Sequence, residues 1–511
     1  FDLAKLHYNK DFTLANIPQD DPTVYEMVSH ADTIGVFQIE SRAQMSMLPR
    51  LKPKSFYDLV IEVAIVRPGP IQGDMVHPYL RRRNGEEPVE FPSKELEEIL
   101  GRTLGVPLFQ EQAMKIAIVA AGFTPSEADE LRRSMATFKA KGKVSYFHDK
   151  LINGMVAKGY TVQYAERVFR QLEGFGSYGF PESHAVSFAL LVYVSSWLKC
   201  YYPDVFVCAL LNSMPMGFYQ PAQLVTDARK HGVDVRPVDV NYSAWDNTLE
   251  EKSGKHCAVR LGFRQVKGLK EGDVQVVTSA RKNGFTSVQQ LREAGVPGAA
   301  LEKLADADAF RSLGYDRREA LWQTSTKDHQ LKSLYADALE NIELPKMKLS
   351  EHVINDYKSL SLSLKAHPVS FVREQLTQLH VCSINRLGEA KDGDHVKVAG
   401  LILVRQRPGT ATGICFITLE DETGNANLVV FRNLFDKYRK EIIQSRLLMV
   451  EGQLQREGEV VHVIVKRCFN VSPLLQQLIQ TKLSRADEKT SNPDTRHKSG
   501  EKVFHEGRNF R

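Results

Sequence analysis

The segment Thr124–Lys143 reads TPSEADELRRSMATFKAKGK and joins a helix start to a cluster of positive charge. Thr124 suits the N-cap position, Pro125 suits the first helical position, and Glu127 can return a hydrogen bond to the cap. From Arg132 onward, five basic side chains follow in twelve residues without an acidic one. Because guanidiniums bind phosphate oxygens in pairs, this segment predicts a helix that packs by one face and offers positive charge to a polyanion.

The same segment has a simpler interpretation, in which its charges only face solvent. Asp129 and Arg133 are four residues apart and can form an ion pair on the helix surface. Runs of charge are usually solvated, so the two interpretations stay open at this point. In the first, the phosphate contacts are Arg132, Arg133, Lys139, Lys141 and Lys143.

A second segment, Gly174–His184, reads GFGSYGFPESH and leads into a long apolar helix. Its glycines permit unusual backbone angles and close approach to another molecule. Loops of this kind at helix starts bind anions or stack on planar ligands, although an ordinary turn with aromatic core residues fits equally well. The candidate contacts here are Tyr178, Gly179, Phe180, Ser183 and His184.

Five motifs spread along the chain share a resemblance. They are GVFQIESRAQM (Gly35–Met45), RPGPIQGDMV (Arg67–Val76), FQEQAMKIA (Phe109–Ala117), ADELRRSM (Ala128–Met135) and FGSYGFPESHAVSFALLVY (Phe175–Tyr193). Together they resemble bacterial family C DNA polymerases, the family of the replicative polymerase III alpha subunit, from the first residues to about residue 470. The closing GRNFR and the end of the chain soon after a β-rich segment favour the error-prone, damage-inducible branch. A replicative alpha subunit fragment is the alternative within the family.

The resemblance implies template-directed nucleotidyl transfer with dNTPs on primer-template DNA, in damage-induced mutagenesis and translesion synthesis. It implies that Arg132 and Arg133 grip the incoming triphosphate and that the lysines after them extend the positive field. It also implies that the nascent base pair or the triphosphate is flanked by Tyr178, Gly179, Phe180, Ser183 and His184. Further motif positions are implied to line the same cleft: Gln38, Glu40, Ser41, Arg42, Arg67, Gln110 and Gln112.

Metal chemistry is also implied, because polymerases use two metal ions held by carboxylates. In the resembled family these carboxylates belong to a palm domain that precedes the GVFQIESR motif. Asp20 and Asp21 do not replace them, since they sit in a turn between Pro18 and Pro22. We therefore expect Mg²⁺ in the full-length enzyme with no ligands in this chain, a C-terminal fragment without the PHP domain and most of the palm, and no activity of the fragment alone.

The expected fold is multidomain, with a mainly α fingers domain, an α-rich helix-hairpin-helix domain and a C-terminal β OB-fold. The expected segments are 1–215 for the fingers with a remnant of the palm linker, 216–345 for the duplex-binding domain, 346–392 for a helical linker, 393–471 for the OB-fold and 472–511 for a disordered polar tail.

Two segments supply the expected DNA contacts. In the first, a turn between short helices offers Gly262, Lys267 and Gly268 to a duplex phosphate, with a weaker helix pair near 298–310; a generic helical hairpin is the alternative. The second has five strands with a helical segment before the fourth, which is the OB arrangement. The expected single-strand contacts there are Arg405, Arg407, Phe416, Phe431 and Arg432.

A short motif, QLKSLY at Gln330–Tyr335, resembles the peptide with which polymerases engage the sliding clamp. Gln330, Leu334 and Tyr335 would supply one amide and two apolar anchors to a groove. A plain amphipathic helix is the alternative. Accessory proteins of a mutasome are further expected partners.

The bulk composition fits a soluble globular protein and excludes several other classes. The chain has 511 residues, a net charge of +5 and a pI of about 8.7, so any nucleic-acid surface must come from local clustering. Its six scattered cysteines indicate a reduced compartment and no zinc site. With no signal peptide or membrane span, we expect a cytoplasmic protein. A non-catalytic DNA-binding scaffold is the alternative of another class.

Overall fold

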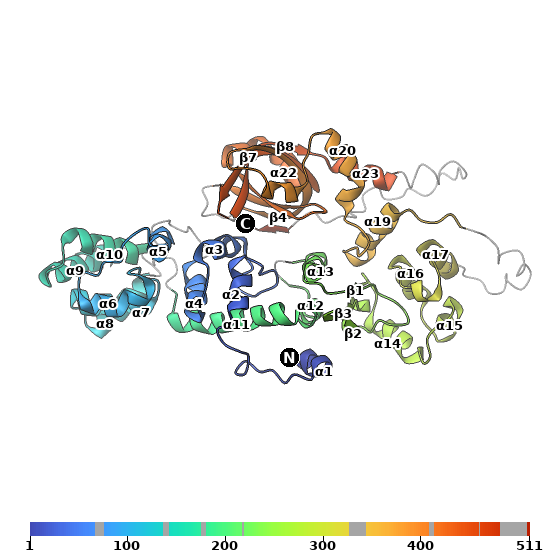
Figure 1. Cartoon of the computed structure of the whole chain (residues 1–511), viewed down its shortest axis with the longest axis horizontal. Helices are drawn as coiled ribbons and strands as arrows, with labels where there is room; N and C mark the ends of the chain where they lie inside the picture. The colour runs from blue at the N-terminus through green and yellow to red at the C-terminus, as the bar shows by residue number, and fades with distance from the viewer. Residues whose placement is uncertain are drawn as a thin grey trace, which may run out of the picture. The chain divides into compact units, whose positions relative to one another are not determined.

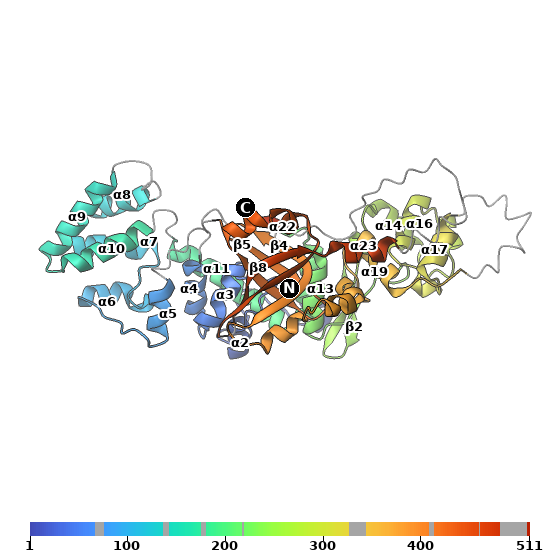
Figure 2. The ribbon, with the colours of Figure 1, turned by 90° about the horizontal axis from the view of Figure 1, so that it is seen from above.

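The computed structural model describes residues 1–66, 76–135, 143–174, 180–216, 219–325, 344–407, 413–458, 460–480 and 508–510. The chain forms two compact units. One contains residues 1–12, 202–457 and 461–511, and the other contains residues 13–201 and 458–460. Figures 1 and 2 show the helices and strands of both units.

The second of these units is built from helices. Their bounds are α2 Pro22–Ser29, α3 Arg42–Leu51, α4 Phe56–Ile65, α5 Val76–Arg83, α6 Lys94–Leu100, η1 Gly101–Thr103, α7 Gln110–Ala121, α8 Pro125–Met135, α9 Lys143–Ala157, α10 Val162–Gly174 and α11 Glu182–Tyr201. Helix α4 is buried from Asp58 to Ile65 and packs against α11. Within the described ranges, no single helix has the length and hydropathy of a membrane span; only α11 and α12 (Pro203–Asn212), taken as a bent pair, meet those criteria.

A helical core formed by α6 to α10 positions the basic helix α8. Ala128 and Leu131 are fully buried on one face of α8, against apolar residues of α7 and α9 such as Ala117 and Leu151. Burial of that face orients the helix, because apolar side chains three or four positions apart line one side of it. The charged residues of α8 therefore lie outside the core.

In the other unit, α1 (Asp2–Tyr8) packs onto α12 and a small sheet. The sheet has the order β1-β3-β2, with β1 (Val235–Arg236) parallel and β2 (Thr248–Ser253) antiparallel to β3 (His256–Arg260). The Tyr8 hydroxyl donates to Asp204 Oδ2 over 2.5 Å, and the Cys257 amide donates to the same oxygen over 2.8 Å. Asp204 is completely buried, so these two donors compensate for the loss of its hydration.

The predicted hairpin region is helical. After α13 (Pro221–Lys230) and the sheet it contains η3 Phe263–Gln265, α14 Glu271–Ala280, α15 Val288–Glu293, α16 Gly298–Asp306, η4 Arg311–Leu313 and α17 Arg317–Ser325. Two short turns, one before α14 and one between α15 and α16, carry positive-φ glycines: Gly268 at +72° and Gly295 at +89°. Positive φ favours glycine because it has no Cβ, which explains these two positions.

The segment expected as a helical linker is helical, but it belongs to a packed core. It contains α19 Leu349–Leu360, η5 Pro368–Val372, α20 Arg373–Gln378 and η6 Ile384–Gly388. Val353 and Val369 share a buried cluster with Met449 of the following β domain and with Leu475. The linker therefore packs directly on the β domain.

The C-terminal β domain has the five predicted strands. They are β4 His395–Gln406, β5 Cys415–Glu420, β6 Asn425–Val430, β7 Leu447–Glu457 and β8 Val460–Asn470, in the order β5-β6-β8-β7-β4 with β4 also paired to β5. The expected helical segment consists of two short helices, α21 (Arg432–Lys437) and α22 (Arg439–Gln444).

In place of the disorder expected from residue 472, Ser472–Gln480 forms helix α23. Its Leu475 is 2% exposed in the shared cluster, so the apolar residues of SPLLQQLI explain the difference. Arg508–Phe510 form a further strand, β9, which pairs with β4.

Candidate nucleotide and DNA contact sites

Both arginines of α8 contact the same carboxylate. Arg132 donates from Nη2 to Asp129 Oδ1 over 2.8 Å and from Nε over 3.0 Å, and Arg133 Nη2 lies 2.7 Å from Asp129 Oδ2. The Arg133 side chain is 74% exposed and that of Arg132 is 36% exposed. The hydrogen bond from Arg132, with the charge of Arg133, lowers the pKa of Asp129. This is the ion pair of the simpler interpretation, yet it also holds two guanidiniums side by side at the surface.

The start of α8 is formed as its sequence predicts. Glu127 accepts hydrogen bonds from the Thr124 amide over 2.9 Å and hydroxyl over 3.0 Å, and its own amide donates to the Thr124 hydroxyl. Lys150 of α9 bonds to Glu127, and this bond lowers the pKa of Glu127 to about 2. The cap therefore fixes where the helix begins. Lys139 and Lys141, like the side chain of Lys143, lie outside the described residues.

The start of α11 carries a ladder of aromatic rings. The ring centroids of Phe180 and His184 are 5.1 Å apart, and those of His184 and Phe188 are 4.2 Å apart. Phe37 stacks on Phe188 at 5.3 Å and is 45% exposed. Exposed aromatic rings are stacking platforms for planar ligands, and Ser183 and His184 are exposed beside this one.

Two members of the ladder, Phe37 and Phe188, were not among the sequence candidates. Phe37 directly precedes the candidate Gln38. Phe188 is four residues after His184, and this helical spacing places His184 and Phe188 on the same face of α11. Phe188 could therefore have been predicted from its spacing to His184. Tyr178 and Gly179 lie outside the described residues.

Backbone contacts hold this helix start against α7. The Gln110 amide donates to the Phe180 carbonyl over 3.2 Å, and the Glu182 amide donates to Glu111 Oε2 over 3.0 Å. The Tyr57 hydroxyl donates to Glu182 Oε1 over 2.9 Å. Motifs that are far apart in the sequence therefore meet at Phe180.

The remaining cleft-motif residues divide into surface and structural positions. Gln38, with φ of +71°, and Arg42 are partly exposed near the aromatic ladder segment, and Ser41 caps α3 by accepting from the Gln44 amide. Gln112 is 5% exposed; its side chain accepts from the Leu108 and Phe109 amides and donates to Ile99 O and Thr103 Oγ1. The prediction of a cleft contact at Gln112 is therefore wrong, because its polar atoms are already satisfied inside the protein. Arg67 lies outside the described residues.

Glu40 makes the folding stability of the fingers depend on pH. Burial raises the pKa of Glu40 from 4.5 to about 7, so the folded state retains a proton that the unfolded state releases. Stability from this group is complete below pH 4.5 and is lost as the pH rises toward 7. Glu40→Gln, which is always neutral, is expected to become progressively more stable than the parent across that window. Urea unfolding at pH 4.5, 6, 7 and 8 measures the difference.

The control for Glu40→Gln is Glu26→Gln, at an exposed position of α2. That variant should follow the parent at every pH. A stability difference between Glu40→Gln and the parent that stays constant from pH 4.5 to 8 would refute the assignment.

Two of the three predicted hairpin contacts make hydrogen bonds inside the protein. The Gly262 amide donates to Asn247 Oδ1 over 2.9 Å, and a Cβ on Gly262 would lie 2.4 Å from the Trp245 carbonyl oxygen. Lys267 donates from Nζ to the Tyr357 carbonyl over 2.9 Å, and burial lowers its pKa. Gly262 is needed for packing. Lys267 ties the hairpin to α19 through this hydrogen bond but is exposed, so a phosphate contact at Lys267 stays a prediction.

Glycines with open surroundings lie at the starts of two hairpin helices. Gly272 is in the first turn of α14 and Gly298 begins α16, and a Cβ on either would meet no atom within 4 Å. Packing inside the protein therefore does not require glycine at these two positions. Gly268 remains at the exposed turn before α14, with its carbonyl accepting from Lys303. Helix starts with accessible backbone amides are suitable phosphate sites.

In the β domain, Arg405 is also structural. It is 6% exposed, and its guanidinium donates from Nε to the Ile442 carbonyl over 2.8 Å and from Nη2 to the Ser445 carbonyl over 2.5 Å. It closes the end of α22. The prediction of a DNA contact at Arg405 is wrong for this reason.

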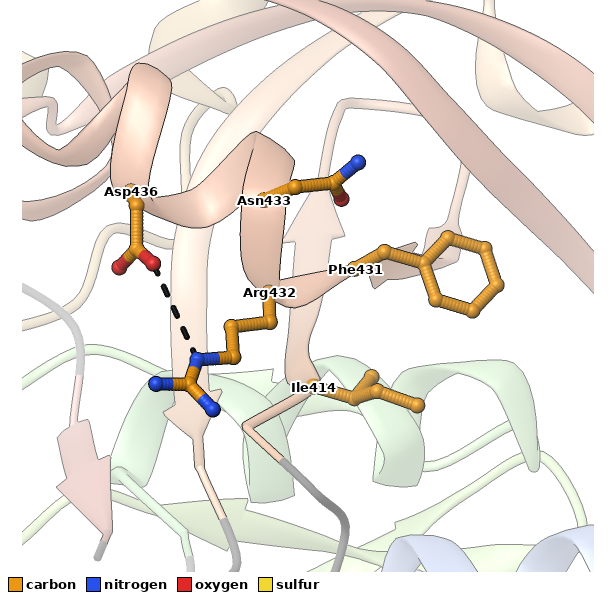
Figure 3. Close-up of a pocket in the computed structure, with 5 residues that line it drawn as sticks. All are labelled: Ile414, Phe431, Arg432, Asn433 and Asp436. Atoms are coloured by element: carbon orange, nitrogen blue, oxygen red, sulfur yellow. Dashed lines mark ion pairs between the residues drawn. The ribbon is translucent and has the colours of Figure 1, made fainter.

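The other β-domain candidates are accessible. Arg407 is exposed and lies 4.5 Å over the Phe435 ring, and Phe416 is partly exposed on β5. Phe431 is 47% exposed, and the Arg432 side chain is 72% exposed, 4.0 Å from Asp436. Figure 3 shows the Phe431 ring and Ile414 extending to one side of an open depression while Arg432 extends toward Asp436. An exposed ring beside a guanidinium is suited to a nucleobase and its phosphate.

Asp20, Asp21 and the cluster around Asp308 do not fit a two-metal site. Asp21 caps α2 and accepts from the Tyr201 hydroxyl, and Asp20 accepts from the Tyr25 hydroxyl. A cluster of Asp308, Asp316 and His352 has ligand atoms close enough for an ion. However, Arg311 bridges both aspartates at 2.9 and 2.8 Å, and Lys365 lies 3.2 Å from Asp308. Protein cations already balance this cluster.

The predicted clamp motif, with Gln330, Leu334 and Tyr335, lies outside the described residues.

Comparison with known proteins places these features in one family. Residues 1–159 match the bacterial DNA polymerase III alpha subunit finger domain, residues 232–320 a helix-hairpin-helix motif, and residues 396–471 an OB-fold nucleic acid binding domain. The predicted fold class is thereby confirmed. The likeness to a solved structure, the hypothetical protein ygiW from E. coli, is slight, with 16% identity over 18% of this chain and a TM-score of 0.14.

Curated relatives match over almost the whole chain. An error-prone DNA polymerase from Sinorhizobium medicae is 54% identical over 509 residues, which are 93% of this chain and 46% of that protein. Error-prone DNA polymerase 2 from Agrobacterium fabrum is 56% identical over 489 residues, 92% of this chain and 45% of that protein. The chain thus spans about half the length of these relatives. By its sequence, it is a region of a bacterial family C DNA polymerase of the error-prone type.

Proposed function

We propose that this chain supplies the nucleotide-holding and DNA-holding parts of an error-prone DNA polymerase that performs template-directed nucleotidyl transfer with dNTPs. The observation that carries the proposal is the identity of 54–56% to error-prone polymerases over more than nine tenths of the chain. Damage-induced mutagenesis and translesion synthesis are the proposed setting. The accessible charged and aromatic surfaces support this assignment.

The proposed triphosphate contact is the arginine pair of α8. Arg132 and Arg133 share the partly exposed carboxylate of Asp129, which holds their guanidiniums close together. A triphosphate presents several anionic oxygens and can replace that single carboxylate. Phe180, His184 and the neighbouring Phe188 and Phe37 are the proposed stacking surface for bases at the nascent pair.

The proposed duplex contact is made by backbone amides at the starts of α14 and α16. Gly272 and Gly298 leave those helix starts open on the protein side, and the helix dipole favours an anion there. The first turn of α16 has no acidic residue, whereas that of α14 already carries Glu271 and Asp273, so α16 is the stronger of the two sites. Contacts of this kind hold the DNA backbone without reading its sequence, as a polymerase requires.

Gly272→Asp tests the duplex contact without disturbing the helix. An aspartate at position 272 adds to Glu271 and Asp273 in the first turn of α14, where negative charge is favourable for the helix itself but repels a phosphate. The variant is expected to bind primer-template DNA about 5- to 10-fold more weakly, measured by fluorescence anisotropy at 0.1 M salt. Gly272→Ala, the matched control, should bind like the parent. Equal affinity of the aspartate variant and the parent would remove α14 from the DNA surface.

For single-stranded template we propose the accessible face of the β domain. Phe431 supplies an exposed ring, and Arg432 and Arg407 supply cations beside it. Aromatic stacking and charge together hold single strands with little sequence preference.

The divalent ions of the reaction are proposed to be Mg²⁺, with ligands that are not in this chain; Asp20, Asp21, Asp308 and Asp316 already have protein partners. We accordingly propose that this chain alone does not extend a primer. A sliding clamp, contacted through Gln330, Leu334 and Tyr335, and mutasome accessory proteins are the proposed protein partners, in the cytoplasm.

A further inference from the structure

The long strand β4 has an edge that its neighbours in the barrel leave uncovered. β5 pairs with β4 from Leu401 to Gln406. β7 pairs with it from His395 to Leu401 and goes no further. Leu401 pairs with both neighbours, so β5 and β7 lie on opposite edges. On the β7 edge, Val404–Gln406 are therefore beyond the reach of the barrel strands.

The end of the chain fills this gap. β9 pairs in parallel with β4 in the register Val404↔Arg508, Arg405↔Asn509 and Gln406↔Phe510. Arg405 also pairs with Ile417 of β5, so β9 must lie on the other edge, as a continuation of β7. Exposed strand edges offer unpaired backbone groups to any extended peptide, and proteins commonly cover them.

The chain is long enough for its own end to reach this edge. Residues 481–507 separate α23 from β9, and 27 residues span up to about 90 Å when extended. Helix α23 is itself packed on the β domain through Leu475, in a cluster with Leu447 and Met449 of β7. The length of the chain therefore permits β9 to dock on β4 of the same molecule.

We propose that Val404–Gln406 is a docking edge for an extended peptide, and that its resident occupant is the C-terminal strand of the same molecule. Recognition is by main-chain hydrogen bonds, the mode in which a peptide adds a strand to a sheet. This interaction surface goes beyond the proposed function, since it needs neither DNA nor nucleotide.

The shortness of β9 makes it a displaceable cover. A parallel strand of three residues forms few hydrogen bonds with its neighbour. Those hydrogen bonds must offset the entropy that is lost when a long loop is closed. The cover also borders the proposed single-strand surface: Gln406 pairs with Phe416 on one edge and Phe510 on the other, and Arg407 follows it. Removing β9 therefore exposes a peptide edge next to that surface.

Hydrogen exchange of the intact chain tests the docking. Proline at position 509 fixes φ and removes an amide, whereas alanine keeps the strand backbone. In Asn509→Pro, peptides that cover Val404–Gln406 should exchange at least about tenfold faster than in the parent, and in Asn509→Ala they should match it. Peptides from α23 serve as an internal folding control. Unchanged exchange in the proline variant would overturn the proposal.

A peptide in solution tests the occupant. A fluorescent peptide with the sequence of residues 507–511, GRNFR, should bind a chain truncated after residue 506 and bind the intact chain at least about tenfold more weakly. Equal binding to both chains, or none to the truncated one, contradicts the proposal. Exchange protection of Val404–Gln406 that rises with protein concentration would assign the edge to a second copy and overturn docking within one molecule.

Discussion

Asp356→Asn is expected to lower the free energy of unfolding of the hairpin region and α19 by about 3–5 kcal/mol, the usual result of removing one partner from a buried ion pair. Asp356 is 1% exposed and Arg317 is completely buried, and they form an ion pair. The variant leaves the guanidinium of Arg317 in the interior without a carboxylate.

Neighbouring groups do not compensate for that loss. Arg317 retains two contacts with His352, from Nη1 to the carbonyl oxygen over 2.8 Å and to ring Nδ1 over 3.3 Å, and neither partner is an anion. Lys365, 3.0 Å from Asp356, loses one of its two anionic contacts and keeps Asp308 at 3.2 Å. The asparagine amide offers one acceptor oxygen where the carboxylate offered two to Arg317, Lys365 and Ser363. Two cations are thus left around one uncharged amide.

The matched control is Glu351→Gln on the same helix. Glu351 is 3.1 Å from Arg318, whose side chain is 32% exposed, so this pair is partly screened by water. The control should cost at most about 1 kcal/mol. Urea unfolding, with hydrogen exchange of α17 and α19 to localise the loss, compares the variants. Equal effects at Asp356 and Glu351 would show that the buried network does not hold the hairpin region to α19.

Replacing Arg132 and Arg133 together by alanine, in a full-length polymerase that contains this region, is expected to raise the KM for dNTPs by about 100-fold. Hydrogen bonds to charged groups contribute about 1.5–3 kcal/mol each, and 1.4 kcal/mol corresponds to a factor of ten. The affinity for primer-template DNA should change by less than about threefold, because the loss is at the triphosphate.

Lys150→Ala is the control for loss of charge in the same helical core. Lys150 bonds to Glu127 on the α8 cap, so its removal takes away a cation without removing a proposed phosphate contact. Its KM should stay near that of the parent. An unchanged KM in the double variant, with a large loss of DNA affinity, would assign the arginines to DNA instead.

Local sequence rules predicted local structure well. The cap at Thr124, the burial of Leu131 and the five strands of the β domain follow from spacing and side-chain type alone. The ion pair between Asp129 and Arg133 could also be predicted, because an α-helix brings residues four apart close together.

The tertiary contacts of the candidate residues could not be predicted from the sequence. Gln112, Gly262 and Arg405 were proposed as contacts because amides, glycines and guanidiniums are common in binding sites. Each is instead committed inside the protein, to loop amides, to the Trp245 backbone and to helix carbonyls respectively. Nothing local distinguishes a buried arginine from an exposed one. Strand β9 was missed likewise, since its three residues form a strand only by pairing with β4.

The most direct test of the account is a titration of primer-template DNA with this chain between 50 and 300 mM NaCl, with dNTPs and Mg²⁺ present and the primer analysed afterwards. We expect the logarithm of the observed binding constant to fall linearly with the logarithm of the salt concentration. We also expect the primer to stay at its original length. Binding that is absent or independent of salt, or a primer that is extended, would contradict the assignment of this chain as a nucleotide- and DNA-holding region.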